Sequence, residues 1–167
     1  MSETFEIVKV GIADLGIVQA PNRIRTSGLG SCVGVVIFNV HLKIAALAHI
    51  MLPDSTTFRG EGLNKAKYAN TAIEEMMTLL QSHGVRRYSP LKAKIAGGAQ
   101  MFQMTSGTKE SMRIGPRNVA AVKQELLKYN IPIVSADVGG ASGRTVEFNP
   151  ETSMLSVRTV NHGTKEI

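Results

Sequence analysis

The sequence predicts an α/β (α+β) sandwich with a mixed, mainly antiparallel β-sheet and two principal helices. Three observations favour this class. Runs of strand length outnumber helical patterns. Only some of these runs are separated by helices, which excludes a purely parallel sheet. Residues 33–38 and 43–52 are apolar on both faces and are joined by a short turn, which is typical of a hairpin in the middle of a sheet.

Composition bounds the class of protein further. The 167 residues, 43% of them hydrophobic, are enough for one domain over residues 1–167 with its own core. A single cysteine excludes a disulfide framework and a cysteine-cluster zinc site, and it fits a reducing cytoplasm. The net charge of +6 comes from scattered basic residues. We therefore expect the partners to be proteins with acidic surfaces. We do not expect a nucleic-acid partner.

No segment has the character of a signal peptide or of a membrane span. The amino-terminal residues lack a basic region followed by an apolar run. The longest apolar stretch, residues 44–52, is too short to cross a bilayer and contains His49. We expect a cytoplasmic protein with no membrane insertion.

The expected strands are rich in β-branched residues and are bounded by glycine, proline or asparagine. In the outer strands apolar residues alternate with polar ones, whereas the central pair is apolar throughout. Asn149 and Pro150 predict a hairpin between the last two strands. The expected strands are residues 5–10, 16–20, 22–26, 33–38, 43–52, 91–96, 131–138, 144–148 and 154–160.

Two segments have helical periodicity. The first, residues 64–83, has one apolar face and ends at Gly84, a residue that commonly terminates helices. The second, residues 116–129, begins with Pro116, which suits a first helical turn. The side chains expected to face inward on the second helix are Val119, Val122, Leu126 and Tyr129.

The glycine-containing segment 26–32 leads to Cys32, a candidate nucleophile. A catalytic cysteine needs a base or a lowered pKa, and backbone N–H donors around the developing oxyanion. Gly28, Gly30 and Ser31 form a turn that can supply such donors, because glycine reaches unusual backbone angles and leaves room for substrate. The alternative is that Cys32 is a small buried apolar residue at the start of a strand, which is commoner for a free cysteine.

His49 is the candidate base. It is the one histidine of four that lies inside an apolar segment. Burying an imidazole is unfavourable unless it has hydrogen-bond partners. In the expected hairpin, the end of the second strand returns beside the start of the first, so His49 is brought towards Cys32. The alternative is a core histidine bonded to a backbone carbonyl.

A third group usually orients such a histidine. Thr26 ends a neighbouring expected strand, so its hydroxyl can take this role. Ser27 and Asp54 are the alternatives. Asp54 would stabilise an imidazolium better, but it lies in a turn beyond Pro53.

Five segments, taken together and in this order, resemble the chemoreceptor glutamine deamidases of the CheD family. The resemblance covers nearly the whole chain, which makes it more specific than one short pattern. The segments are Thr26-Ser-Gly-Leu-Gly-Ser-Cys32, Ala48-His-Ile-Met-Leu-Pro-Asp54, Ala93-Lys-Ile-Ala-Gly-Gly-Ala99 with Met101-Phe102, Ile114-Gly-Pro-Arg-Asn118 and Asp137-Val-Gly-Gly140.

The resemblance implies a catalytic set of Cys32, His49 and Thr26 and a sandwich fold distantly similar to the deamidating toxins. It implies deamidation of chemoreceptor glutamines to glutamate through a cysteine thioester, with no metal or organic cofactor. It also implies binding to the CheC phosphatase. Phe102 follows a Gly-Gly turn and is a candidate anchor for that partner, or else packs on the core.

Other classes fit less well. Gly30, Cys32 and Gly34 match the nucleophile elbow of hydrolases, but there the histidine lies much further along the chain and a helix follows the turn. Gly28 and Gly30 lack the spacing and the following helix of a dinucleotide-binding loop. A non-catalytic regulator of the CheC phosphatase is the remaining alternative.

Overall fold

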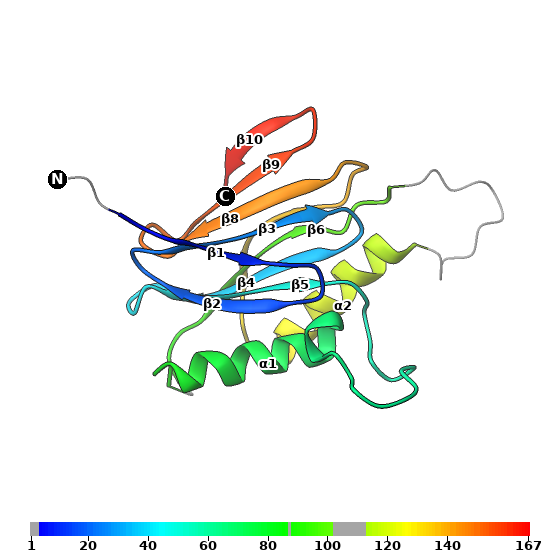
Figure 1. Cartoon of the computed structure of the whole chain (residues 1–167), viewed down its shortest axis with the longest axis horizontal. Helices are drawn as coiled ribbons and strands as arrows, with labels where there is room; N and C mark the ends of the chain where they lie inside the picture. The colour runs from blue at the N-terminus through cyan, green and yellow to red at the C-terminus, as the bar shows by residue number, and fades with distance from the viewer. Residues whose placement is uncertain (1–3, 87, 102–112) are drawn as a thin grey trace.

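The computed structural model describes residues 4–86, 88–101 and 113–167 and shows a mixed α+β fold (Figure 1). The described residues form two five-stranded sheets and two α-helices. The strands are β1 Ile7–Val10, β2 Leu15–Gln19, β3 Arg23–Leu29, β4 Val33–Asn39, β5 Ile44–Ile50, β6 Lys92–Gly97, β7 Ile133–Val138, β8 Arg144–Asn149, β9 Met154–Thr159 and β10 Gly163–Glu166. The helices are α1 Ala69–Ser82, α2 Ile114–Lys128 and the short 3-10 helix η1 Lys65–Lys67.

Strand pairing confirms the predicted mixed, mainly antiparallel character. The first sheet has the order β1-β3-β8-β9-β10 and the second the order β2-β5-β4-β6-β7. Among the strands of the described residues, the pairs β1–β3 and β6–β7 are the parallel ones. The expected central hairpin is present as the antiparallel pair β4–β5. The expectation of one sheet was wrong, because alternation in a strand shows which face is buried but not in which sheet the strand lies.

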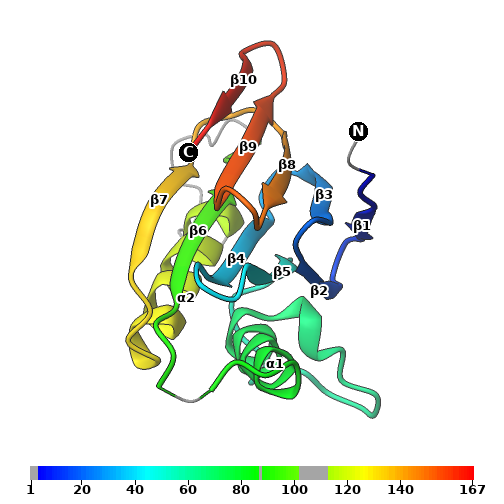
Figure 2. The ribbon, with the colours of Figure 1, turned by 90° about the vertical axis from the view of Figure 1, so that its left-hand side faces the viewer.

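The second sheet lies between the helices and the first sheet (Figures 1 and 2). Odd-numbered residues of β4, such as Val35 and Ile37, pack in the core on the helix side. Even-numbered ones, such as Val36 and Phe38, pack in the core between the sheets. Both faces of β4 and β5 are therefore buried, which explains why these strands have no polar alternation.

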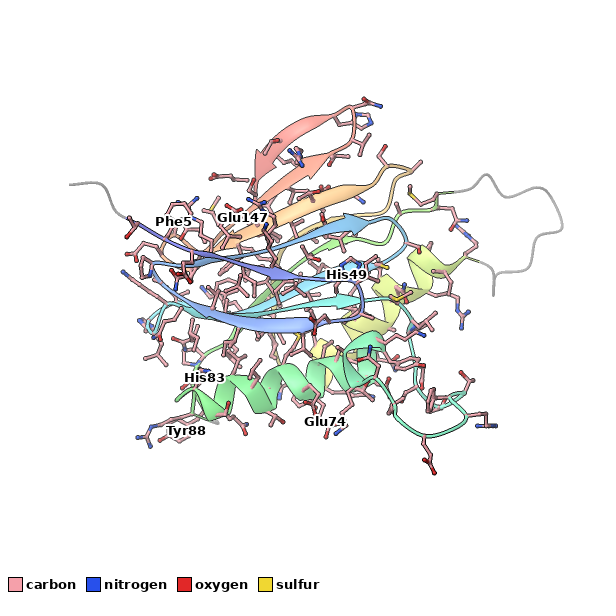
Figure 3. The ribbon with its side chains drawn as sticks, in the orientation of Figure 1. Phe5, His49, Glu74, His83, Tyr88 and Glu147 are labelled. Carbon is pink, nitrogen blue, oxygen red and sulfur yellow. The ribbon has the colours of Figure 1, made fainter. Side chains whose placement is uncertain are left out.

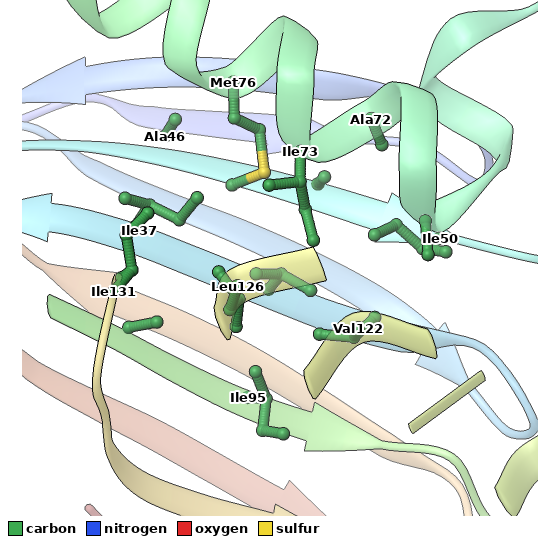
Figure 4. Packing of buried hydrophobic residues seen from close by; sticks show 14 of the residues in the cluster. Ile37, Ala46, Ile50, Ala72, Ile73, Met76, Ile95, Val122, Leu126 and Ile131 are labelled. Atoms are coloured by element: carbon green, nitrogen blue, oxygen red, sulfur yellow. The ribbon is translucent and has the colours of Figure 1, made fainter. Parts of the chain in front are cut away.

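Both helices pack on the same face of the second sheet. Ile73 and Met76 of α1 and Val122 and Leu126 of α2 are completely buried there (Figure 4). In contrast to the prediction, Tyr129 is not inward: it follows the last turn of α2 and is 40% exposed. Among the described residues, no helix is long and apolar enough to cross a bilayer.

Several boundaries differ from the prediction, among them the start of α2, which is Ile114 rather than Pro116. Helix α1 begins at Ala69 rather than at residue 64, because the Asn64 side chain caps η1 and Tyr68 is then extended. Strand β10 was not predicted. All four residues of β10 are exposed, and the three that follow Gly163 are polar, so the strand carries no hydrophobic pattern.

Candidate active site

Cys32 lies in the turn of residues 30–32 between β3 and β4. Hydrogen bonds to the backbone carbonyl groups of these residues hold the turn in place. All three of its carbonyls accept hydrogen bonds from other segments, two from the loop after β6 and one from α2. The donors are Ala99 N–H to Gly30 (2.8 Å), Asn118 Nδ2 to Ser31 (3.0 Å) and Gly98 N–H to Cys32 (2.8 Å). The position of Cys32 therefore depends on segments far from it in sequence.

The end of β6 and the residue after it pack so closely on the turn and on α2 that only glycine fits. Gly97 has a φ of +105°, and a Cβ placed there would lie 2.3 Å from the carbonyl oxygen of Cys32. Gly98 has a φ of +64°, and its Cβ would lie 2.2 Å from a methyl group of Val119. Real Cβ atoms do not approach other atoms so closely, so both glycines are required for this packing.

His49 lies near the end of β5, opposite Gly34 of β4. Its backbone is fixed by the loop before β2: its N–H donates to Asp14 O (2.9 Å) and its carbonyl accepts from Ala13 N–H (3.1 Å). Its side chain is completely buried and lies between the strands of the two sheets (Figure 3).

Thr26 of β3 orients the imidazole. Its Oγ1 lies 2.7 Å from His49 Nδ1 and donates its one hydrogen to the Val10 carbonyl at 2.8 Å. Since that hydrogen is used, Nδ1 must be the donor to Oγ1, and this network assigns the proton of the neutral ring to Nδ1. Nε2 then carries the free electron pair. It is buried and has no hydrogen-bond partner in the described part of the chain.

The two alternative orienting residues lie elsewhere. Ser27 follows Thr26 in β3, so its side chain points to the opposite face, where it is exposed. Asp54 is exposed in the turn after β5, and its carboxylate accepts a hydrogen bond from Thr56 N–H at 2.7 Å. Of the three candidates, Thr26 is the one that contacts His49.

Cys32 and His49 lie on the same face of the second sheet. The partly buried Cys32 packs against the core between the sheets, to which the His49 ring also points. Gly34 pairs with His49, and Cys32 precedes Gly34 by two residues, so Cys32 and His49 are related as diagonal neighbours. Such neighbours have Cα atoms about 7–8 Å apart, within reach of longer side chains. The side chains of Leu29 and Val146 lie over Gly34 on this face: a Cβ on Gly34 would be 3.1 Å from a methyl group of Leu29 and 3.6 Å from one of Val146.

Burial keeps both groups neutral in the resting site. It raises the pKa of the Cys32 thiol above its ordinary 9.0. It lowers the pKa of His49 below its ordinary 6.5. At neutral pH the thiol therefore keeps its proton and the imidazole is unprotonated, which is the state from which a base can accept that proton.

The lowered pKa of His49 predicts the acid side of the pH profile of a reaction in which this residue is the base. A base must be unprotonated to accept a proton, so activity that depends on His49 as base is lost as the pH falls through the pKa of that residue. We expect the acid midpoint of kcat/KM to lie below 6.5. Measuring kcat/KM between about pH 4 and 8 tests this. A midpoint at or above 6.5 would contradict it.

Two N–H groups of the turn are available for an oxyanion. Gly30 N–H donates to Gly28 O at 3.1 Å and is therefore occupied. The N–H groups of Ser31 and Cys32 have no acceptor among the residues that the structure describes. Met101 lies beside this turn: a Cβ on Gly30 would be 3.3 Å from its side chain.

Sequence reasoning missed one polar contact of the site. Asn118 of α2 is completely buried, and its Nδ2 bonds to both Ser31 O and Met51 O. The available signal was an amide on the apolar face of a helix. The candidate anchor Phe102 lies outside the described residues. Within the described ranges, no three His, Cys, Asp or Glu side chains lie close enough to share a metal ion.

Comparison with known proteins gives consistent matches. The family model described as CheD chemotactic sensory transduction matches residues 51–159. The chain is 56% identical over 162 residues to the chemoreceptor glutamine deamidase CheD of Halalkalibacterium halodurans. This alignment covers 97% of this chain and 99% of the relative. It is 52% identical over 161 residues to the Bacillus subtilis protein of the same name, with 96% of each chain covered.

These relatives define the class as an enzyme of the deamidase type. The chain belongs to the CheD family. The family-model match begins after His49 and so does not include the segment from Thr26 to His49. The alignment to the Halalkalibacterium protein covers 162 of the 167 residues and therefore includes most or all of that segment.

Proposed function

We propose that this protein deamidates glutamine side chains of chemoreceptors to glutamate, with Cys32 as nucleophile, His49 as base and Thr26 as the residue that orients His49. The observation that carries the proposal is the Thr26–His49 hydrogen bond of 2.7 Å. It leaves the unprotonated Nε2 on the sheet face that also holds the thiol. The substrate class comes from the relatives, which are named chemoreceptor glutamine deamidases.

The first half-reaction forms a thioester. His49 Nε2 accepts the proton of Cys32 Sγ as the sulfur attacks the carboxamide carbon of the glutamine side chain. The carbonyl π electrons move to the oxygen and give a tetrahedral oxyanion. When this intermediate collapses, the C–N bond breaks and Nε2 returns the proton to the nitrogen, which leaves as ammonia.

The second half-reaction hydrolyses the thioester. His49 Nε2 accepts a proton from water while the water oxygen bonds to the acyl carbon. Collapse of the second oxyanion breaks the C–S bond, and the sulfur recovers its proton from Nε2. The product is glutamate, and the scheme uses no metal or organic cofactor. The turn with Gly28, Gly30 and Ser31 provides the setting for both oxyanions, with the free N–H groups of Ser31 and Cys32 as donors.

The remaining expectations stay part of this proposal. Residues 1–167 act as one deamidase domain, because Thr26 comes from one sheet and His49 from the other, so that both sheets are needed for the site. The expected location of this domain is the cytoplasm. The CheC phosphatase is the expected protein partner, with Phe102 as candidate anchor. A distant likeness of the fold to the deamidating toxins also remains a prediction.

One experiment tests the proposed activity directly. A purified chemoreceptor cytoplasmic fragment is incubated with the protein and with Cys32→Ala, and glutamine residues are mapped by mass spectrometry. We expect glutamine-to-glutamate conversion with the unaltered protein and none above background with Cys32→Ala. Equal conversion by both would refute Cys32 as nucleophile. No conversion by either, with binding to CheC retained, would favour the non-catalytic regulator.

A further inference from the structure

Asn118 joins the two segments that carry the candidate nucleophile and base. Its Nδ2 donates to Ser31 O at 3.0 Å and to Met51 O at 2.9 Å. Ser31 directly precedes Cys32, and Met51 follows His49 by two residues. Two carbonyl acceptors require the NH₂ group, so the orientation of the carboxamide is determined. Its Oδ1 is buried and has no hydrogen-bond partner in the described residues.

The bond to Ser31 fixes more than a carbonyl. Ser31 C=O and Cys32 N–H belong to the same planar peptide unit, in which the two groups point in opposite directions. Holding the carbonyl toward α2 therefore directs the N–H of Cys32 away from α2. That N–H is one of the two turn donors without an acceptor among the described residues.

The peptide units on either side of this one are anchored by the loop after β6. Cys32 O accepts a hydrogen bond from Gly98 N–H at 2.8 Å, and Gly30 O accepts one from Ala99 N–H at 2.8 Å. The loop fixes the carbonyls on either side of Ser31, whereas only Asn118 fixes the carbonyl of Ser31 itself among the described contacts. Removing the amide would free this one peptide unit to rotate.

We propose that Asn118 is a positioning residue, which holds the Ser31–Cys32 peptide so that the Cys32 N–H stabilises the oxyanion. The inference rests on the proposed function and deepens it. Oxyanion donors act on the transition state, so their loss lowers kcat more than it raises KM. Alkylation of the thiol by iodoacetamide proceeds without an oxyanion, so it reports the thiol alone.

The test compares Asn118→Leu, which has a similar volume and no donor, with Asn118→Ser, which keeps a shorter donor. For both we expect kcat for glutamine deamidation to fall about 10- to 100-fold, with KM changed less than about threefold. The rate of Cys32 alkylation by iodoacetamide should stay within about twofold of the unaltered protein, since displacement at carbon in this reagent forms no oxyanion. Val122→Ala, one turn further along α2 and buried in the helix-side core, is the control for lost stability without lost donors.

Each outcome decides the inference. An unchanged kcat in either folded Asn118 variant overturns it. An equal loss of kcat and of alkylation rate also overturns it, because the amide would then act on the thiol. A loss of kcat in Val122→Ala as large as in Asn118→Ser would show a general effect of stability. Failure of the proposed function is separate, since Cys32→Ala would then keep full deamidation.

Discussion

Replacing His49 by asparagine should abolish turnover while leaving the fold nearly intact. The asparagine Nδ2 can occupy the place of the ring Nδ1 and donate to Thr26 Oγ1, which now lies 2.7 Å from that nitrogen. The variant has no atom equivalent to Nε2, so no base remains for the Cys32 proton. We expect kcat for glutamine deamidation to fall about 1000-fold or more, with KM changed only a few-fold.

Thr26→Val is the matched control for this variant. It removes the oxygen that accepts from Nδ1 but keeps the base, so we expect a smaller loss of kcat, about 10- to 100-fold. Comparing kcat of the two variants separates the effect of losing the base from the effect of losing the group that orients it. A His49→Asn variant that keeps more than about a tenth of the normal kcat would contradict the role of Nε2. Circular dichroism and urea unfolding establish that each variant is folded.

The sequence was sufficient to predict the hairpin that carries Cys32 and His49. Its two strands are continuous apolar runs with a short connection, and both signals are local. The hairpin alone predicts that His49 is brought towards Cys32, whereas the register that pairs Gly34 with His49 comes from the structure. This part of the site was predictable because the chain between the two residues is short.

Patterning and geometry inferred from the sequence did not choose among Thr26, Ser27 and Asp54, and only the family resemblance implied Thr26. The choice depends on which face of β3 meets the second sheet, and β3 pairs with β1 and β8 rather than with its neighbours in sequence. The hydrogen bond from Thr26 to Val10 O, which assigns the His49 tautomer, also comes from that packing. Contacts between sheets are set by the tertiary fold, and local patterns carry no information about them.

Asn118 and Gly97 illustrate the same limit. Asn118 lies on the buried face of an amphipathic helix, where an amide indicates a polar contact without naming its partners, and only the approach of α2 to the turn reveals its two acceptors. Gly97 directly follows the expected strand 91–96 and has the local pattern of a glycine that ends a strand. Its close contact with the carbonyl of Cys32 spans 65 residues of sequence, and a single sequence does not show such a contact.

Gly97→Ala should therefore impair both stability and activity. The added methyl group would lie 2.3 Å from the carbonyl oxygen of Cys32, and the φ of +105° is one that side chains rarely adopt. The turn or β6 must shift to relieve this contact. We expect the free energy of unfolding to fall by about 3 kcal/mol, measured in urea. We also expect kcat to fall about 10-fold or more in the variant that remains folded, because small displacements of a nucleophile have large kinetic effects.

Gly84→Ala separates the backbone effect from the contact with Cys32. Gly84 follows α1 with a φ of +94°, and a Cβ there would have no heavy atom within 4 Å. We expect this variant to lose about 1–2 kcal/mol of stability from its backbone angle alone and to keep its normal kcat. If the two variants lose the same stability and both keep full activity, the close packing of the end of β6 on Cys32 has no part in placing the thiol.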